Sequence, residues 1–203
     1  MNHFKSSDWL DKEGRYWTTF FNTISGPRSA VLIGTQDENK IGNLGIFNSL
    51  VHIGAKPPLL GFILRPTSVP RDTYENILKT GNYTINHITS QLVEQAHKSS
   101  AKYASDVDEF NAIGLSKKFI QDCHAPFIKE SPIKLGLKLV EEHIIKANGT
   151  RLIVGEVKHV LIDNELVNPD GYIDTTAAQT MLTSGLDAYH SHQLQTRLPY
   201  AKP

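Results

Sequence analysis

Cysteine is almost absent from this chain, because Cys123 is the single one among 203 residues. An internal disulfide is therefore excluded, and there is no CxxC pair to hold a metal or to serve as a redox centre. Long apolar runs are missing too: none is long enough to span a membrane, and the opening residues carry Asp8 where a signal peptide would be apolar. We expect a soluble, cytoplasmic protein with no membrane partner.

The sequence also lacks an excess of charge of either sign, since 21 lysines and arginines balance 21 aspartates and glutamates. Without a net charge that would attract nucleic acid or an anionic membrane, any anion must be bound by a local basic site.

Signatures of nucleotide hydrolases and Rossmann folds are missing as well. There is no GxxxxGK[ST] loop, and residues 42–45 are not a GxGxxG fingerprint followed by a helix.

The histidines do not suggest a metal site. Nine are present, but no His-Glu-x-x-His pattern occurs, and His190-Ser191-His192 lacks a clear third ligand. Cys123 and His124 are adjacent and point in opposite directions if the chain is extended there, so a structural role is favoured over a thiolate nucleophile.

The sequence does contain a series of short apolar, β-branched segments separated by turns. This pattern favours a mainly β fold, a β-barrel with antiparallel strands and a few short helices, over a doubly wound sheet. Asn148-Gly149 predicts a hairpin with a type I′ turn. The polar stretch 99–132 contains Pro126 and Pro132, has no clear period and is predicted to form helical fragments and a loop. The predicted strands are residues 30–35, 41–47, 51–54, 59–64, 83–88, 137–145 and 151–162, and the predicted helices begin near residues 73 and 89.

The most informative stretch begins at Arg65. Arg65 and Arg71 flank a Pro-rich turn, and Asp72 and Thr73 are placed to begin a helix that Gly81 would terminate. Cationic side chains, a hydroxyl and free backbone N–H groups would then converge on one anion, as at a phosphate site. Asp72 would repel phosphate, so we assign it to capping or to orienting an arginine. Taken alone, both arginines are more often solvated surface residues.

A second segment, Asn43-Leu44-Gly45-Ile46-Phe47-Asn48-Ser49, lies about twenty residues earlier in the chain. Together with Arg71-Asp72-Thr73 it resembles the flavin reductase-like family, whose fold is the FMN-binding split β-barrel. In that family an Asn-Leu-Ala-Pro-Phe-Ser type segment runs beside the flavin, and Lys-Asp-Thr precedes a short helix. Gly45 and Ile46 replace the usual small-residue and proline pair, while Asn48 and Ser49 still offer their donors.

This resemblance implies a flavoprotein with bound FMN. No catalytic acid or base is implied, because NADH or NADPH can pass hydride directly to the flavin ring when the two rings stack. Without the resemblance, Asn43 and Asn48 would be read as turn residues and Phe47 as core. The implied cofactor-binding residues are Thr35, Asn43, Leu44, Gly45, Ile46, Phe47, Asn48, Ser49, Arg65, Arg71, Thr73, Asn86 and Tyr189.

Three parts of the chain follow from the resemblance and the length: a leader (1–24), a flavin-binding split-barrel domain (25–165) and a C-terminal extension (166–203) that packs on the barrel or on a dimer partner. We expect a homodimer that acts as an NAD(P)H-dependent, FMN-using oxidoreductase. Two alternatives are an electron-transfer flavoprotein similar to flavoredoxin and a flavin-binding module without turnover.

Overall fold

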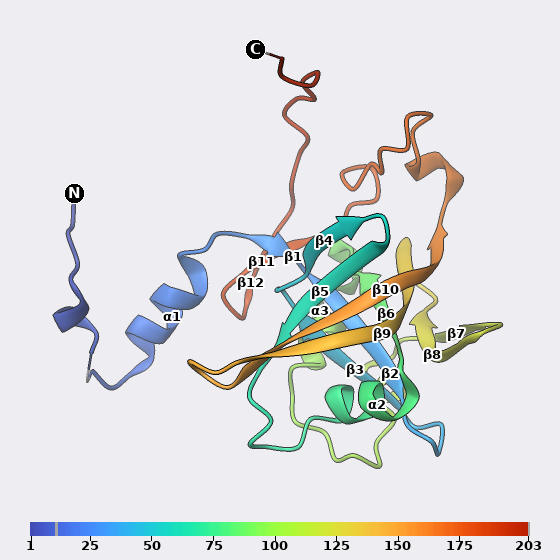
Figure 1. Ribbon diagram of the computed structural model, residues 1–203, viewed down its shortest axis with the longest axis horizontal. Coiled ribbons are helices and arrows are strands. Elements are labelled where there is room, and N and C mark those ends of the chain that lie inside the picture. Colours follow the sequence, from blue (N-terminus) through green and yellow to red (C-terminus); the bar gives the residue numbers. More distant parts are fainter. Residues whose placement is uncertain (11, 203) are drawn as a thin grey trace.

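The computed structural model describes residues 1–10 and 12–202 and is built around one large antiparallel sheet (Figure 1). Its seven strands follow one another in the order β3-β2-β6-β9-β10-β5-β4, and every neighbouring pair is antiparallel. The predicted mainly β, antiparallel fold is therefore confirmed. The strands are β2 (Val31–Gln36), β3 (Gly42–Phe47), β4 (Val51–Ala55), β5 (Pro58–Leu64), β6 (Asn82–His87), β9 (Ile133–Ile145) and β10 (Thr150–Ile162).

Smaller elements surround this sheet. One three-stranded sheet joins β1 (Arg28–Ser29) to β11 (Leu182–Ser184) and β12 (Ala188–His190), so segments near the two ends of the chain lie side by side. A hairpin pairs β7 (Lys117–Ile120) with β8 (Cys123–Ile128). The helices are α1 (Arg15–Thr23), α2 (Asp72–Thr80), α3 (Val93–Lys98) and α4 (Glu109–Ile113), with 3-10 turns η1 (Ser6–Asp8), η2 (Ser90–Leu92) and η3 (Asn164–Leu166).

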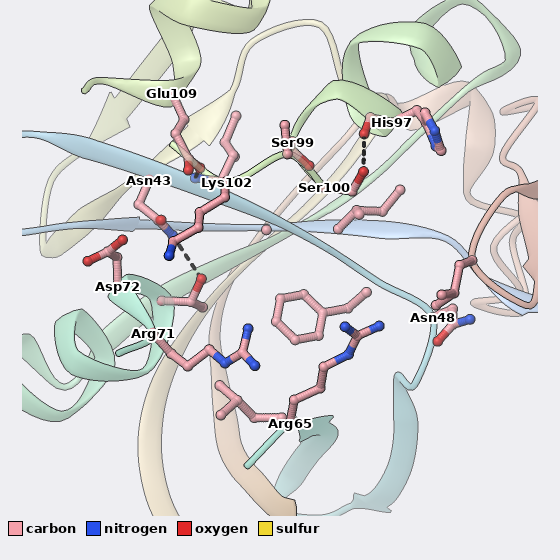
Figure 2. A pocket seen from close by; sticks show the side chains of 18 of the residues that line it. Asn43, Asn48, Arg65, Arg71, Asp72, His97, Ser99, Ser100, Lys102 and Glu109 are labelled. Carbon is pink, nitrogen blue, oxygen red and sulfur yellow. Dashed lines mark hydrogen bonds between the residues drawn. The ribbon is translucent and has the colours of Figure 1, made fainter. Parts of the chain in front are cut away.

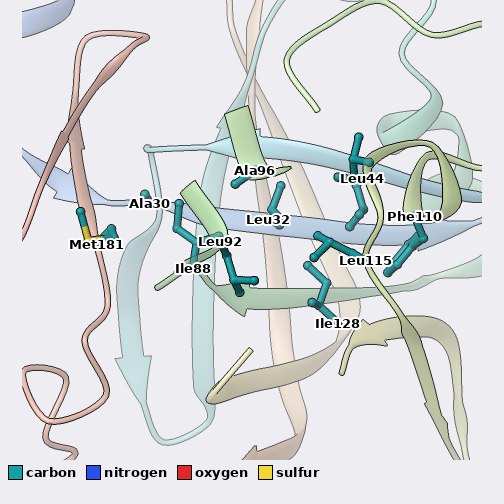
Figure 3. Close-up of a cluster of buried hydrophobic side chains, with 11 residues drawn as sticks. Ala30, Leu32, Leu44, Ile88, Leu92, Ala96, Phe110, Leu115, Ile128 and Met181 are labelled. Carbon is teal, nitrogen blue, oxygen red and sulfur yellow. The ribbon is translucent and has the colours of Figure 1, made fainter. Parts of the chain in front are cut away.

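The hydrophobic core lies on both faces of β2, whose six residues are all buried. Because side chains alternate along a strand, Val31 and Ile33 join one apolar cluster with Phe62 of β5, while Leu32 joins a second cluster with Phe110 of α4. Figure 3 shows the second cluster, formed where α3 and α4 cover the sheet. Burying each such large side chain stabilises the fold by about 1.5–3 kcal/mol. This two-sided burial explains the unbroken apolar run that predicted the strand.

Two sequence-based expectations are wrong. Residues 99–132 form α4 and the β7–β8 hairpin as well as loops. Pro126, which argued against a strand, lies within β8, where its carbonyl accepts a hydrogen bond of 2.7 Å from the Thr84 hydroxyl. The hairpin predicted at Asn148-Gly149 is confirmed, because β9 pairs with β10, but its predicted turn type is wrong. A type I′ turn needs positive φ at two central residues, whereas here Ile145 pairs with Thr150 across four residues, and only Gly149 of the Asn-Gly pair has positive φ (73°).

The first part of the chain forms a helix that stands apart from the large sheet in Figure 1. No residue of α1 is buried, and Trp17 contacts the aromatic rings of Phe4, Trp9 and Phe21. In the part of the chain that the structure describes, no helix is long and apolar enough to cross a membrane.

Candidate functional site

A cavity of about 690 Å³ opens along the edge strand β3, and we call it the β3 pocket. Its volume falls in the range typical of small-molecule sites, about 300–1,000 Å³. Its walls are β3 with the residues that follow it, the turn before α2, the segment between α3 and α4, and the β11–β12 hairpin. The lining residues are 43–49, 63–65, 69–73, 97, 99–103, 109, 183, 185–187 and 189.

The β3 pocket brings together all the predicted site residues except Thr35 and Asn86. Segments far apart in the chain therefore meet at one place, as the resemblance implied. Figure 2 shows Arg65 and Arg71 entering the cavity from one side, with Asn48 at one end and Asn43 at the other.

The N-terminus of α2 lies at the wall of this pocket, which residues 71–73 line. Arg71 is the N-cap in an extended conformation, and no side chain caps the helix. The first helical bond runs from the Glu75 N–H to the Arg71 carbonyl (3.0 Å), so the earlier N–H groups have no partner within the helix. The predicted capping role of Asp72 is therefore wrong, and in the described residues Asp72 forms no ion pair with an arginine either. An uncapped helix N-terminus attracts anions.

The predicted end of α2 is confirmed, since Gly81 is the left-handed cap with φ 68°.

Both predicted arginines are available to an anion. Neither Arg65 nor Arg71 forms an ion pair with any residue in the described part of the chain. The Nε atom of Arg71 is buried and has no hydrogen-bond partner. Because a buried donor without a partner is costly, this atom is suited to an acceptor supplied by a ligand. We refer to Arg65, Arg71, Thr73 and the N-terminus of α2 as the anion site.

A polar network behind the pocket fixes the position of Thr73. The Asn43 amide donates to the Thr73 hydroxyl oxygen (2.8 Å) and to that of Thr35 (3.2 Å), and Asn76 also donates to Thr35 (3.2 Å). Thr73 accepts from Asn43, and its own O–H proton has no acceptor among the described residues, so it is available to a ligand. Thr35 is fully buried behind Asn43 and does not line the cavity.

Asn86 lies outside the pocket. Its side chain is fully buried, donates to the Leu32 carbonyl (3.2 Å) and the Thr84 hydroxyl (2.9 Å), and accepts from the Ile128 N–H (2.9 Å). These bonds tie β6 to β2 and β8, which is a structural role.

Along β3, Gly45 permits a close approach of the pocket wall. A Cβ atom added there would lie 2.8 Å from Cε2 of Phe47 and 3.2 Å from the Thr73 hydroxyl.

Phe47 has two roles. Its ring packs edge-on against Phe62, with 4.9 Å between the ring centroids, and it also lines the cavity. Ser49 is fully engaged with β5: its hydroxyl donates to the Ile63 carbonyl (3.1 Å) and accepts from the Ile63 N–H (3.0 Å).

The C-terminal hairpin closes the far end of the pocket. Asn48 donates to the Gly185 carbonyl (2.8 Å), and the Tyr189 hydroxyl lies 3.0 Å from Nδ1 of His97 on α3. Burial raises the pKa of Tyr189, so its hydroxyl stays protonated at neutral pH. Tyr189 lies beside the pocket because the hairpin is held by Asn48, which follows β3, and by His97 of α3.

Several lining residues were missed by the sequence reasoning, above all Glu109 at the start of α4. The residue is only 8% exposed, and its carboxylate accepts a hydrogen bond of 2.6 Å from the Leu44 N–H. Burial raises the pKa of Glu109 to about 7, and the negative charges of Asp72 and Asp108 add to the effect, against the lowering influence of the Leu44 bond. No sequence motif marked this residue, because it lies in the polar stretch without a period.

Comparison with known proteins places the chain in one family. Its residues 25–180 match the family model described as flavin reductase like domain. The crystal structure of an inferred flavin reductase with a split barrel domain from Shewanella frigidimarina NCIMB 400 is 46% identical, with a TM-score of 0.94 over 99% of this chain and 100% of that one. The chain therefore belongs to the flavin reductase-like family, and the predicted split barrel is confirmed.

Two more distant structures share the fold. Nitrilotriacetate monooxygenase component B from Bacillus cereus is 16% identical, with a TM-score of 0.85 over 98% of this chain and 100% of that one. Flavoredoxin of Desulfovibrio vulgaris (Miyazaki F) is 21% identical, with a TM-score of 0.75 over 86% of this chain and 92% of that one. At these identities they show the fold alone. Family membership supports a flavin cofactor and a flavin-related oxidoreductase function.

Proposed function

We propose that this protein is an FMN-dependent oxidoreductase that takes hydride from NADH or NADPH and passes the electrons to a further acceptor. The observation that carries the proposal is the anion site at one side of the β3 pocket. The uncapped N-terminus of α2, the Arg71 side chain, whose Nε has no partner in the described residues, and the Thr73 hydroxyl all lie at the wall of one cavity. This donor set suits a phosphate monoester, which FMN carries and riboflavin lacks.

The chemical character of the rest of the pocket suits a flavin ring. The segment 43–49 lines the cavity and includes the partly buried apolar residues Ile46 and Phe47 beside the polar Asn48. A partly apolar slot with a few fixed polar groups is typical of cofactor sites. FMN, when bound, supplies the ring that accepts and releases hydride.

The chain's own residues position the reactants and exclude water. Arg71 and Thr73 would hold the phosphate, because both residues line the cavity and the Asn43 network fixes the Thr73 hydroxyl oxygen. The hairpin held by Asn48 and His97 walls off the far end of the pocket. None of these roles moves a proton, in agreement with a direct hydride transfer between stacked rings.

The proposal includes a homodimer. Support comes from the family resemblance and from the N-terminal helix, whose residues are all unburied although they include Trp17 and Phe21. Phe21 is 44% exposed, and helices this short are only marginally stable in water unless another surface covers them. Light scattering at micromolar concentration should give twice the chain mass, and a monomer mass would refute the dimer.

An anaerobic titration tests the oxidoreductase proposal. The FMN-loaded protein is mixed with NADH and, separately, with NADPH, and the visible flavin band is followed. Rapid bleaching by either nucleotide is expected. Slow bleaching by both, with fast reduction by a reduced redox protein, would replace the proposal by electron transfer. A flavin that stays oxidised with every donor would leave a binding module.

A further inference from the structure

Glu109 is a buried carboxylate in the β3 pocket for which the proposed function has no use. It is the first residue of α4, and its Oε2 atom accepts the Leu44 N–H at 2.6 Å. The neighbouring Asp108 accepts the Gly42 N–H at 3.1 Å. Since β3 is an edge strand, these two carboxylates satisfy N–H groups that would otherwise lack a neighbouring strand. The position of Glu109 is therefore fixed by the backbone of the pocket wall.

This carboxylate lies next to the anion site. Leu44, to which it is bonded, follows Asn43, and Asn43 donates to Thr73 at 2.8 Å. Figure 2 shows Glu109, Asn43 and Asp72 gathered at the same end of the cavity. A phosphate on Thr73 and the α2 N-terminus would thus share a confined region with this acid.

The charges around Glu109 are unbalanced. Asp72 on α2 and Asp108 on α4 both oppose its ionisation, and Asp108 is already paired with Lys117 of β7. The cations that also line the pocket are Arg65 after β5, Arg71 at the α2 N-cap, and Lys102 from the segment between α3 and α4. Burial and the two acids raise the pKa of Glu109 to about 7, so its charge changes within the physiological range.

We propose that Glu109 makes ligand binding in the β3 pocket proton-linked, so that a phosphate-bearing ligand at the anion site and a proton on Glu109 bind together. The inference rests on the proposed function only for the identity of the ligand, FMN. The physical reason is repulsion: a phosphate dianion disfavours a second negative charge on a buried carboxylate of the same cavity. By reciprocity, a proton on Glu109 strengthens phosphate binding by the same factor.

The experiment measures the Kd of FMN by fluorescence between pH 7 and 8.5, where the phosphate is already a dianion because its second pKa is about 6. For the wild-type protein the Kd should rise with pH, on the order of tenfold over this range, because one linked proton changes affinity by up to tenfold per pH unit. Glu109→Gln should remove the rise. Glutamine keeps an oxygen that can accept the Leu44 N–H, so this variant retains the wall contact and loses only the charge.

Three controls make the result specific. Glu94→Gln, on the exposed surface of α3, should keep the wild-type slope. Riboflavin, which has no phosphate, should bind with a much shallower pH dependence. Calorimetry in two buffers of different ionisation enthalpy should show proton uptake on FMN binding to the wild type near pH 7.5 and none to Glu109→Gln.

The outcomes are distinct. A wild-type Kd that does not change with pH, an equal slope in Glu109→Gln, or an equal slope for riboflavin would each overturn the proton linkage. If Glu109→Gln does not fold, Asp72→Asn tests the same idea, since removing that charge should move the pH dependence to lower pH, and an unmoved curve would overturn it. Absence of FMN binding at every pH would instead refute the proposed function.

Discussion

Replacement of Arg71 by alanine is the sharpest test of the anion site. In the structure the Arg71 Nε atom is buried with no partner, so the side chain contributes a donor that the protein itself does not use. A hydrogen bond to a charged group is worth about 1.5–3 kcal/mol, which corresponds to a Kd for FMN weakened roughly 10- to 150-fold in Arg71→Ala. Stability should change little, because the substitution removes an unsatisfied donor and breaks no ion pair in the described residues.

The assay is quenching of flavin fluorescence on binding, measured with FMN and with riboflavin at fixed ionic strength. Arg71→Ala should weaken FMN binding and leave riboflavin binding nearly unchanged, since only FMN carries the phosphate. Arg15→Ala, on the exposed α1 helix, serves as the matched loss of an arginine outside the pocket. An unchanged FMN affinity in Arg71→Ala, with a folded protein, would remove Arg71 from the anion site.

Three further predictions concern stability. Tyr83→Phe should leave the free energy of unfolding unchanged or raise it by about 1 kcal/mol, because the Tyr83 hydroxyl is buried without a partner; urea denaturation measures this, and a large loss would show a hidden partner. Gly155→Ala should lower it by about 1–3 kcal/mol, since the new Cβ would lie 2.1 Å from the Tyr83 hydroxyl oxygen, and the loss should be smaller in the Tyr83→Phe background. The pKa of Glu109 is raised in the folded state from 4.5 to about 7, so its stabilising contribution is full below pH 4.5 and is lost as pH rises through 7. Urea denaturation should therefore show wild-type stability falling by up to about 3 kcal/mol relative to Glu109→Gln across that interval, and parallel curves would contradict it.

The sequence carried enough local information to predict the large sheet and α2. The strand 30–35 was visible because both faces of β2 are buried, which requires an unbroken apolar run. The helix end at Gly81 was visible because a left-handed residue favours glycine. The strand β8 was not predicted because it contains Pro126, and proline is rare within strands. Whether a strand tolerates proline depends on tertiary contacts that the local sequence does not show.

The candidate site was predictable only where its residues share a motif. The segments 43–49 and 65–73 were found, and the pocket joins them. Glu109 and Gly185 were not predicted as site residues. Glu109 contacts Leu44, 65 residues away in the sequence, and Gly185 contacts Asn48, 137 residues away. No local sequence pattern indicates contacts between residues so far apart. Thr35 was predicted to line the site but lies behind Asn43, fully buried. The alternation of side chains along a strand predicts which face a residue occupies and not how deeply it is buried.

The most direct test of the central claim is the visible spectrum of the purified protein after incubation with FMN and removal of free flavin by gel filtration. The structure predicts that flavin stays with the protein and that its absorption bands are shifted by the β3 pocket, and that Arg71→Ala retains less of it. A wild-type protein that emerges without flavin, even at concentrations well above micromolar, would contradict the assignment of this pocket to FMN.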